Sequence, residues 1–113
     1  MSAVQFGLDN FTLVIDNNHM QSDGASEAIL DLSDRYGAML RAVGFETIEV
    51  DGHDVAVLID AFQSARTEGK PCALVAHTVK GKGVSFMENN NDWHHNRLTE
   101  EQYQRAITEV EEA

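Results

Sequence analysis

The side chains with the clearest capacity for chemistry lie after a short apolar run near the start of the sequence. Asp16, Asn17 and Asn18 follow directly on "FTLVI". A carboxylate and two carboxamides are hard oxygen donors of the kind that Mg²⁺ selects, and Mg²⁺ completes its shell with phosphate oxygens and water. The same residue types also begin ordinary turns after strands. The spacing alone leaves both interpretations open.

A second group lies in "HTVKGKGVSF", where Lys80 and Lys82 alternate with Gly81 and Gly83. Glycine lets the backbone approach a ligand closely, and lysine supplies positive charge. The spacing of a Walker A loop is absent. A flexible surface loop with two solvated lysines is the alternative explanation.

A third group, "DWHHNR", places Trp93, His94 and His95 side by side in the sequence. Histidine can transfer protons near neutral pH or donate hydrogen bonds to phosphate oxygens. A zinc site made from the 5 histidines and Cys72 is another possibility. The spacing of these residues matches no recurrent zinc pattern, which argues against it.

The hydrophobic pattern predicts strands and helices in alternation, with these groups between them. We expect a fully buried strand at 11–15, an alternating polar and apolar strand at 46–50 and a strand with an apolar run at 72–78. Helices are expected at 29–44, 55–69 and 99–112, and loops at 21–28 and 79–97. This order is typical of an α/β fold, an open parallel sheet with flanking helices. Ligands of such sheets bind beyond the carboxyl ends of the strands. Asn17 and Asn18 are therefore expected to converge with residues 80–95 on one site.

The composition is strongly acidic, with 8 Lys and Arg against 19 Asp and Glu and a net charge of −11. This balance argues against non-specific nucleic-acid binding, which needs clustered positive charge. A phosphate-bearing ligand must therefore be held by a local device such as a metal ion. A single cysteine, the lack of a secretion signal and the lack of a long apolar run predict a cytoplasmic protein with no membrane span.

Taken together, several stretches resemble one known family. "VIDNNHMQSDG", "VGFETIEVDGHD", "KPCALVAHTVKGKGVSFMENN" and "WHH" occur in this order, as in the thiamine diphosphate-binding domain of transketolase. The resemblance is strongest to the separate N-terminal subunit of transketolases that are split into two polypeptides, and it runs from about Phe6 to the C-terminus. Deoxyxylulose-phosphate synthases share the strand and the glycine–lysine loop but not "FMENNNDWHH", so they are the weaker resemblance.

The resemblance implies a cofactor, a reaction and a set of site residues. The cofactor is thiamine diphosphate with Mg²⁺ or Ca²⁺, and the reaction moves a two-carbon ketol unit from a ketose phosphate to an aldose phosphate. Asn18 corresponds to a side-chain ligand of the metal and Met20 to a backbone carbonyl ligand. Lys80 corresponds to a residue near the diphosphate. His94 corresponds to a catalytic histidine between the diphosphate and the substrate.

The family's Gly-Asp-Gly motif, which carries a further metal ligand, does not occur in this sequence. We therefore expect residues 1–113 to form a single partial domain, with the Gly-Asp-Gly half missing upstream and residues 1–8 forming the last turn of a helix. The expected partners are the C-terminal transketolase subunit, the missing N-terminal half, or both, in a homo- or hetero-oligomer. Alone, the chain is expected to be inactive unless Asp16 or Asp23 replaces the missing ligand. The alternative function is a non-catalytic docking domain.

Overall fold

A computed structural model describes residues 1–22, 24–66 and 68–112 of the chain. The chain forms two compact units. The first unit contains Met1–Asn17 and Leu32–Thr78, and the second contains Asn18–Asp31 and Val79–Ala113. Each unit is described by itself below.

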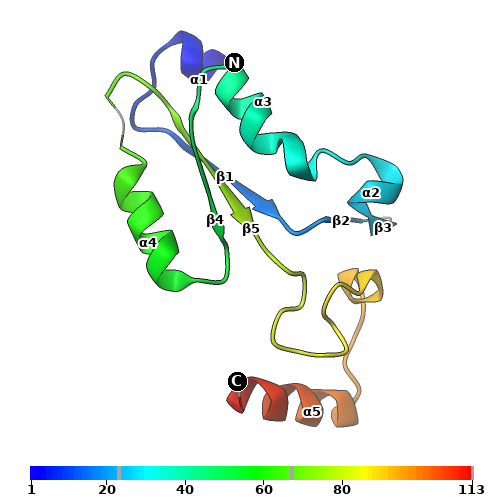
Figure 1. Ribbon diagram of the computed structural model, residues 1–113. Coiled ribbons are helices and arrows are strands. Elements are labelled where there is room, and N and C mark those ends of the chain that lie inside the picture. Colours follow the sequence, from blue (N-terminus) through cyan, green and yellow to red (C-terminus); the bar gives the residue numbers. More distant parts are fainter. Residues whose placement is uncertain (23, 67, 113) are drawn as a thin grey trace. The chain divides into compact units, whose positions relative to one another are not determined.

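The first unit is built on a three-stranded sheet in the order β1-β5-β4, flanked by helices (Figure 1). Both strand pairs are parallel. The predicted α/β fold with an open parallel sheet and flanking helices is thereby confirmed. Its elements are α1 (Ser2–Gln5), β1 (Thr12–Asn17), the 3₁₀ turn η1 (Ser33–Arg35), α3 (Tyr36–Ala42), β4 (Glu46–Asp51), α4 (Val55–Ser64) and β5 (Cys72–His77).

The two long helices of this unit cover opposite faces of the sheet. The chain moves from β1 across to β4 and then back to β5, so two right-handed crossovers place α3 on one face and α4 on the other. On the α3 face, Leu40 packs in a core with Phe45, Ala73 and Val75. On the α4 face, the helix residues Ala61 and Ala65 are buried.

The central strand β5 is buried on both faces, as its continuous apolar run predicts. The prediction that "FTLVI" is fully buried is wrong, since Val14 is 50% exposed while Leu74, its register partner in β5, is 0% exposed. β1 lies at the edge of the described sheet and pairs with β5 alone there. A strand with one neighbour and one covered face cannot bury every side chain.

The helix predicted at 29–44 is shorter than the periodicity suggests, because α3 begins only at Tyr36. Asp31, Ser33 and Asp34 precede it in the sequence, and such residues offer the backbone alternatives to a helix. Its predicted stop is confirmed, since Gly44 follows the helix with φ +102°. Likewise α4 begins at the predicted place, where the Asp54 carboxylate accepts the Val57 N–H at 3.1 Å.

The second unit contains a small hairpin, a long loop and the last helix. The hairpin strands β2 (Met20–Gln21) and β3 (Gly24–Ala25) and the short helix α2 (Ser26–Ile29) replace the predicted loop at 21–28. The loop at 79–97 is confirmed and contains one 3₁₀ turn, η2 (Asn91–His94). The last helix, α5 (Glu100–Glu111), opens with a capping box formed by Thr99 and Gln102. Within the described residues, no helix is long and apolar enough to cross a membrane.

Candidate functional site

Asn18 and Met20 form a tight turn immediately after β1. The Oδ1 atom of Asn18 accepts a hydrogen bond from the Met20 N–H at 2.9 Å. Between them, His19 has a left-handed backbone with φ 59°, a conformation in which histidine is less rare than most residues. The turn fixes the Asn18 carboxamide against the backbone of Met20.

The hairpin that follows sets the direction of the Met20 carbonyl. The Ser26 N–H donates to the His19 carbonyl at 2.8 Å, and Met20 lies opposite Ala25 in the antiparallel register. Since hydrogen-bonded and non-hydrogen-bonded pairs alternate, Met20 and Ala25 form a non-hydrogen-bonded pair. The N–H and C=O of Met20 therefore both point away from β3, on the side where Asn18 accepts the N–H. A carboxamide oxygen and a carbonyl oxygen share that side.

Lys80 begins a closed loop in which one of the two predicted glycines is required for packing. The Asn89 N–H donates to the Lys80 carbonyl at 2.9 Å and closes the loop. Gly81 has φ +75°, and a Cβ atom there would lie 2.5 Å from the Met87 carbonyl oxygen. Gly83 has φ +91°, but a Cβ atom there would meet nothing within 4 Å. Of the two, only Gly83 has room for a ligand to approach the backbone, as the sequence suggested for both.

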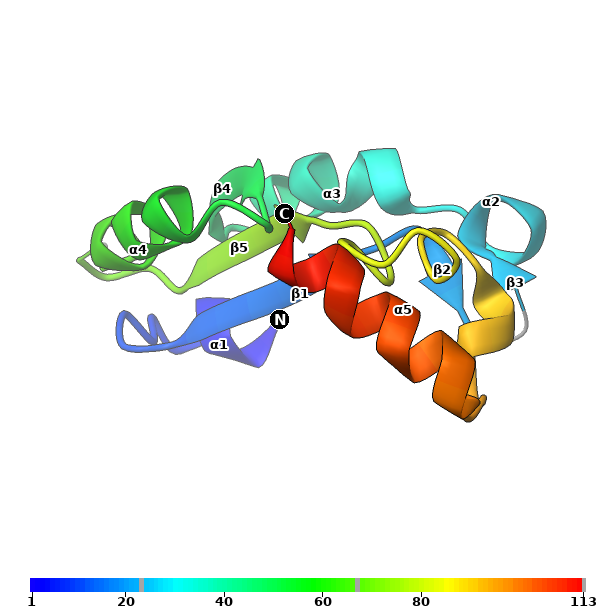
Figure 2. The ribbon, with the colours of Figure 1, turned by 90° about the horizontal axis from the view of Figure 1, so that it is seen from below.

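Aromatic contacts hold the second half of this loop in place. The rings of Phe86 and Trp93 are 5.3 Å apart, and the Trp93 Nε1–H donates to the Phe86 carbonyl at 3.0 Å. The Arg105 guanidinium of α5 lies 5.2 Å from the centre of the Phe86 ring, a cation–π contact. Figure 2 shows α5 running beside the loop.

Glu109 on α5 adds a charged anchor for the same loop. Its carboxylate accepts the Ser85 hydroxyl at 2.8 Å and pairs with Arg105 at 2.7 Å. The hydrogen bond from the Ser85 backbone, followed by that from Arg105, lowers the pKa of Glu109. Loop and helix thus form one supported structure around Ser85 and Phe86.

His94 ends the turn η2 and is exposed. Its ring meets that of His95 edge to face, with centroids 4.5 Å apart. In the same turn, Asn91 donates through Nδ2 to the Ser22 carbonyl at 3.2 Å. The Oδ1 atom of Asn91 is buried without a hydrogen-bond partner among the described residues. The Asn91–Ser22 bond ties the histidine-bearing turn to the hairpin that follows Asn18.

The four predicted site residues, Asn18, Met20, Lys80 and His94, all lie in the second unit. Asp16 lies in the first unit, where its carboxylate accepts the Thr78 hydroxyl, and Asp23 lies outside the described residues. The zinc alternative finds no support in the described part of the chain, where no cluster of three His, Cys, Asp or Glu could hold a metal ion.

The sequence did not reveal a polar chain of side chains at the carboxyl end of the sheet. The Nδ1 atom of His77 lies 3.2 Å from the Asn17 side-chain nitrogen, and its Nε2 atom lies 3.3 Å from a carboxylate oxygen of Glu49. The Glu49 carboxylate in turn pairs with the Arg41 guanidinium at 2.9 Å. The hydrogen bond from Arg41 is the main cause that lowers the pKa of Glu49. The parallel register sets Asn17 and Asp51 level with His77, and Glu49 lies two positions before Asp51 on the same face of β4.

Comparison with known proteins identifies the family of this chain. The family described as "Transketolase, thiamine diphosphate binding domain" matches residues 1–110. An apulose-4-phosphate transketolase subunit of Phocaeicola vulgatus is 40% identical over 99% of the chain, which covers 40% of that protein. A 6-deoxy-6-sulfo-D-fructose transketolase subunit of Clostridium is 36% identical over 92% of the chain, which covers 38% of it. The chain thus spans about two fifths of these relatives.

Solved structures agree with these sequence matches. The transketolase of Campylobacter jejuni superimposes with a TM-score of 0.83 at 27% identity, over 97% of this chain and 18% of that one. A transketolase from Pichia stipitis gives a TM-score of 0.85 at 20% identity over 97% of this chain and 16% of that one, a likeness of fold.

Proposed function

Because the chain belongs to the family of the transketolase thiamine diphosphate-binding domain, we propose that it supplies one part of a thiamine diphosphate and metal site for ketol transfer between sugars. The observation that carries the proposal is the turn at Asn18. The Asn18 carboxamide oxygen and the Met20 carbonyl oxygen share one side of a rigid turn, and both are donors that Mg²⁺ and Ca²⁺ accept. The residues present therefore fit the metal.

Mg²⁺ takes few ligands from a protein and completes its octahedron with phosphate oxygens and water. Two oxygens from this chain are consistent with such a site, provided that the diphosphate and another segment supply the remainder. Ca²⁺ takes more oxygen ligands in a looser geometry. We propose Mg²⁺ or Ca²⁺ as the cation of the site.

Lys80 and His94 are the residues of this chain that we propose for the phosphate side. In a chain of net charge −11, a diphosphate needs local cations to offset long-range repulsion. Lys80 follows β5 at its carboxyl end, and His94 is held on η2 by the bond from Asn91 to the hairpin. Lys80 would bind phosphate as a point charge, and His94 would donate to an oxygen of the diphosphate or the substrate.

Thiamine diphosphate supplies carbanion stabilisation when it is bound, and the protein supplies binding and orientation. This chain would orient the metal through Asn18 and Met20, while a second polypeptide would complete the site. Similar proteins are named as single subunits of transketolases, which supports a partner of this kind. The names of these relatives include a sugar phosphate and a sulfosugar, so we propose a substrate that carries a phosphate or sulfonate group.

Replacement of Asn18 tests the proposed metal ligand. The assembly contains this chain, the C-terminal transketolase subunit and the portion of the Phocaeicola vulgatus relative that does not align with the chain. In it we expect Asn18→Ala to weaken thiamine diphosphate binding by about 100-fold or more, since even groups that only orient a ligand change metal affinity 10- to 100-fold. Equilibrium dialysis with thiamine diphosphate and Mg²⁺ measures the affinity. Gln104→Ala is the control, because it removes an exposed carboxamide from α5, away from both Asn18 and the strands.

Circular dichroism should show the Asn18→Ala chain folded, since the substitution removes one hydrogen bond worth about 1 kcal/mol. Equal cofactor affinity in the folded Asn18→Ala and wild-type assemblies would remove Asn18 from the metal shell. If the wild-type assembly itself bound no cofactor, the non-catalytic docking domain would become the better account of this chain.

A further inference from the structure

The sheet face that carries α4 is covered over β4 and β5 but remains open over β1. Thr12, Val14 and Asp16 lie on this face, since their register partners in β5 are Cys72, Leu74 and Ala76. Val14 is 50% exposed, whereas the neighbouring Leu74 is fully buried. Parallel sheets are normally covered on both faces, so the exposed strip on β1 lacks its cover among the described residues.

The helix α4 carries an apolar stripe that remains about half exposed or more. Val55, Ile59 and Phe62 lie four and three residues apart, and they are 69%, 52% and 47% exposed. The buried positions in this part of the chain are Ala61 and Ala65, so the larger apolar side chains of the stripe stay exposed. An apolar stripe with this spacing is the surface by which one helix packs against another.

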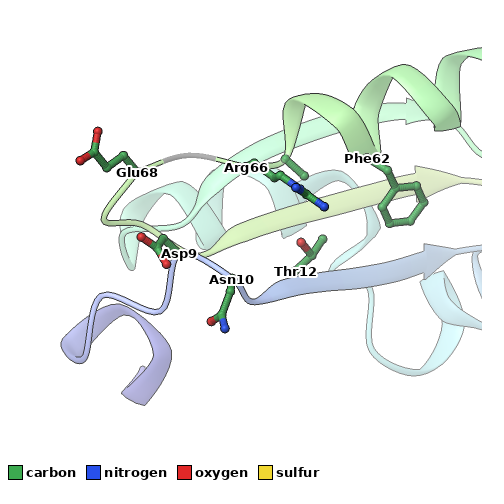
Figure 3. A pocket seen from close by; sticks show the side chains of 7 residues that line it. Asp9, Asn10, Thr12, Phe62, Arg66 and Glu68 are labelled. Carbon is green, nitrogen blue, oxygen red and sulfur yellow. The ribbon is translucent and has the colours of Figure 1, made fainter.

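Between α4 and β1 the two surfaces meet in a groove (Figure 3). Phe62 of α4 and Arg66, which follows the helix, reach toward the strands, and Thr12 projects from β1 on the same side. The groove is lined by Asp9, Asn10, Thr12, Phe62, Ala65, Arg66 and Glu68. Its wall is apolar at Phe62 and Ala65, and Asp9 and Glu68 lie toward one end.

The outer edge of β1 offers backbone hydrogen-bonding groups beside this groove. The Cys72 and Thr78 N–H groups donate to the carbonyls of Phe11 and Asn17, so the odd-numbered residues of β1 face β5. By alternation, the backbone groups of Thr12 and Val14 face the open edge. A strand edge of this kind is a template for another strand.

We propose that the groove between α4 and β1 docks an amphipathic helix, and that the edge of β1 pairs with a parallel strand, both from the part of a transketolase-type subunit that this chain does not span. The chain covers 40% of one such subunit, and a strand joined to a helix by a right-handed crossover fills both surfaces together. A second copy of this chain is a poorer occupant, because each copy carries a net charge of −11.

The proposal rests on family membership and not on the proposed metal ligands, so its test needs no cofactor. The chain is co-expressed with a tagged polypeptide comprising the portion of the Phocaeicola vulgatus transketolase subunit that does not align with it. We expect the two polypeptides to co-purify, and we expect hydrogen exchange at Thr12 and Val14 to slow in the complex.

Val14→Lys and Phe62→Lys should each reduce recovery of the complex at least 10-fold, about the loss from one central interface residue. Both positions are exposed, so the variants should remain folded. The matched control is Val110→Lys on α5, where the valine is 57% exposed and lies outside the groove. Asn18→Ala should leave the docking unchanged, which separates a failure of this proposal from a failure of the metal site.

Three results would overturn the proposal. The first is no association of the wild-type chain with the co-expressed polypeptide. The second is equal recovery of the complex with Val14→Lys, Phe62→Lys and Val110→Lys. The third is dimerisation of the chain alone, seen by analytical ultracentrifugation and abolished by Val14→Lys, because this would make a second copy the occupant.

Discussion

His94 and His95 present two neighbouring imidazoles, and only one corresponds to the proposed role. Both are exposed, and their rings meet edge to face. Because His94 lies in η2, which Asn91 ties to the hairpin after Asn18, its position is the better fixed of the two. The chemistry of the site therefore depends on a side chain that the surrounding turn orients.

We predict that His94→Ala lowers kcat of a complete assembly by about 100-fold, the lower range for a group that transfers protons, while cofactor retention falls less. Steady-state kinetics and equilibrium dialysis on the same preparation measure the two effects. His95→Ala is the control and should change neither strongly. A larger loss of cofactor than of kcat in His94→Ala would argue against a role on the substrate side.

Glu49 gives a prediction about pH. Its pKa is lowered mainly by the hydrogen bond from Arg41, so the folded chain binds this proton less tightly than the unfolded chain. The stabilisation is complete above the unfolded glutamate pKa of about 4.3 and is lost as the pH falls through the lower folded value. Since the Glu49 side chain is 36% exposed, the effect should stay below about 1 kcal/mol.

Urea unfolding between pH 7 and pH 3 tests this. Glu49→Gln should be less stable than the wild type at pH 7, and the difference should vanish toward pH 3. Glu46→Gln on the same strand is the control for removal of a charge. A difference between Glu49→Gln and the wild type that persisted unchanged at pH 3 would contradict the assignment.

At the scale of elements, alanine substitutions in the glycine–lysine loop distinguish the cost of a steric clash from the cost of backbone strain. Gly81→Ala would place a Cβ atom 2.5 Å from a backbone oxygen in a left-handed conformation, whereas Gly83→Ala has a similar conformation but open space. We expect Gly83→Ala to destabilise the chain by about 1 kcal/mol and Gly81→Ala by more, up to about 3 kcal/mol. Urea unfolding of the two variants measures the order, and equal losses would show that packing against Met87 contributes nothing.

The helices and strands also show which parts of the fold can be predicted from the sequence. The strands, α5 and the start of α4 were predictable because apolar periodicity and caps are local signals, as Asp54 and Thr99 illustrate. The end of α4 was not, since the helix ends at Ser64 and not at 69. The exposure of Val14 was not predictable, since a buried and an edge strand share the same apolar run. The apolar periodicity predicts too early a start for α3, because it takes no account of the polar residues before Tyr36.

The candidate site, too, could be predicted from the sequence only in part. The residue types around Asn18 suggested a cation, but the assignment of Met20 came from the resemblance alone, since a backbone carbonyl leaves no trace in a sequence. The link from Asn91 to Ser22 joins residues 69 positions apart. Contacts of this kind depend on tertiary structure and carry no local pattern.

At the scale of the whole molecule, the proposed site and the docking groove lie in different units. The proposed ligands lie in the second unit, while the groove and the edge of β1 lie in the first. We therefore predict that cofactor binding and docking respond to different substitutions. We also predict that cofactor binding depends on polypeptide supplied from outside this chain, because two protein oxygens are few for a stable metal–diphosphate site.

The central claim is tested most directly by calorimetric titration of thiamine diphosphate with Mg²⁺ into the chain, first alone and then with its partners present. These partners are the C-terminal transketolase subunit and the co-expressed remainder of the Phocaeicola vulgatus relative. We predict no measurable heat of binding for the chain alone and saturable binding in the complete assembly, which Asn18→Ala abolishes. No binding in either case would contradict the account and leave a transketolase scaffold that serves only for docking.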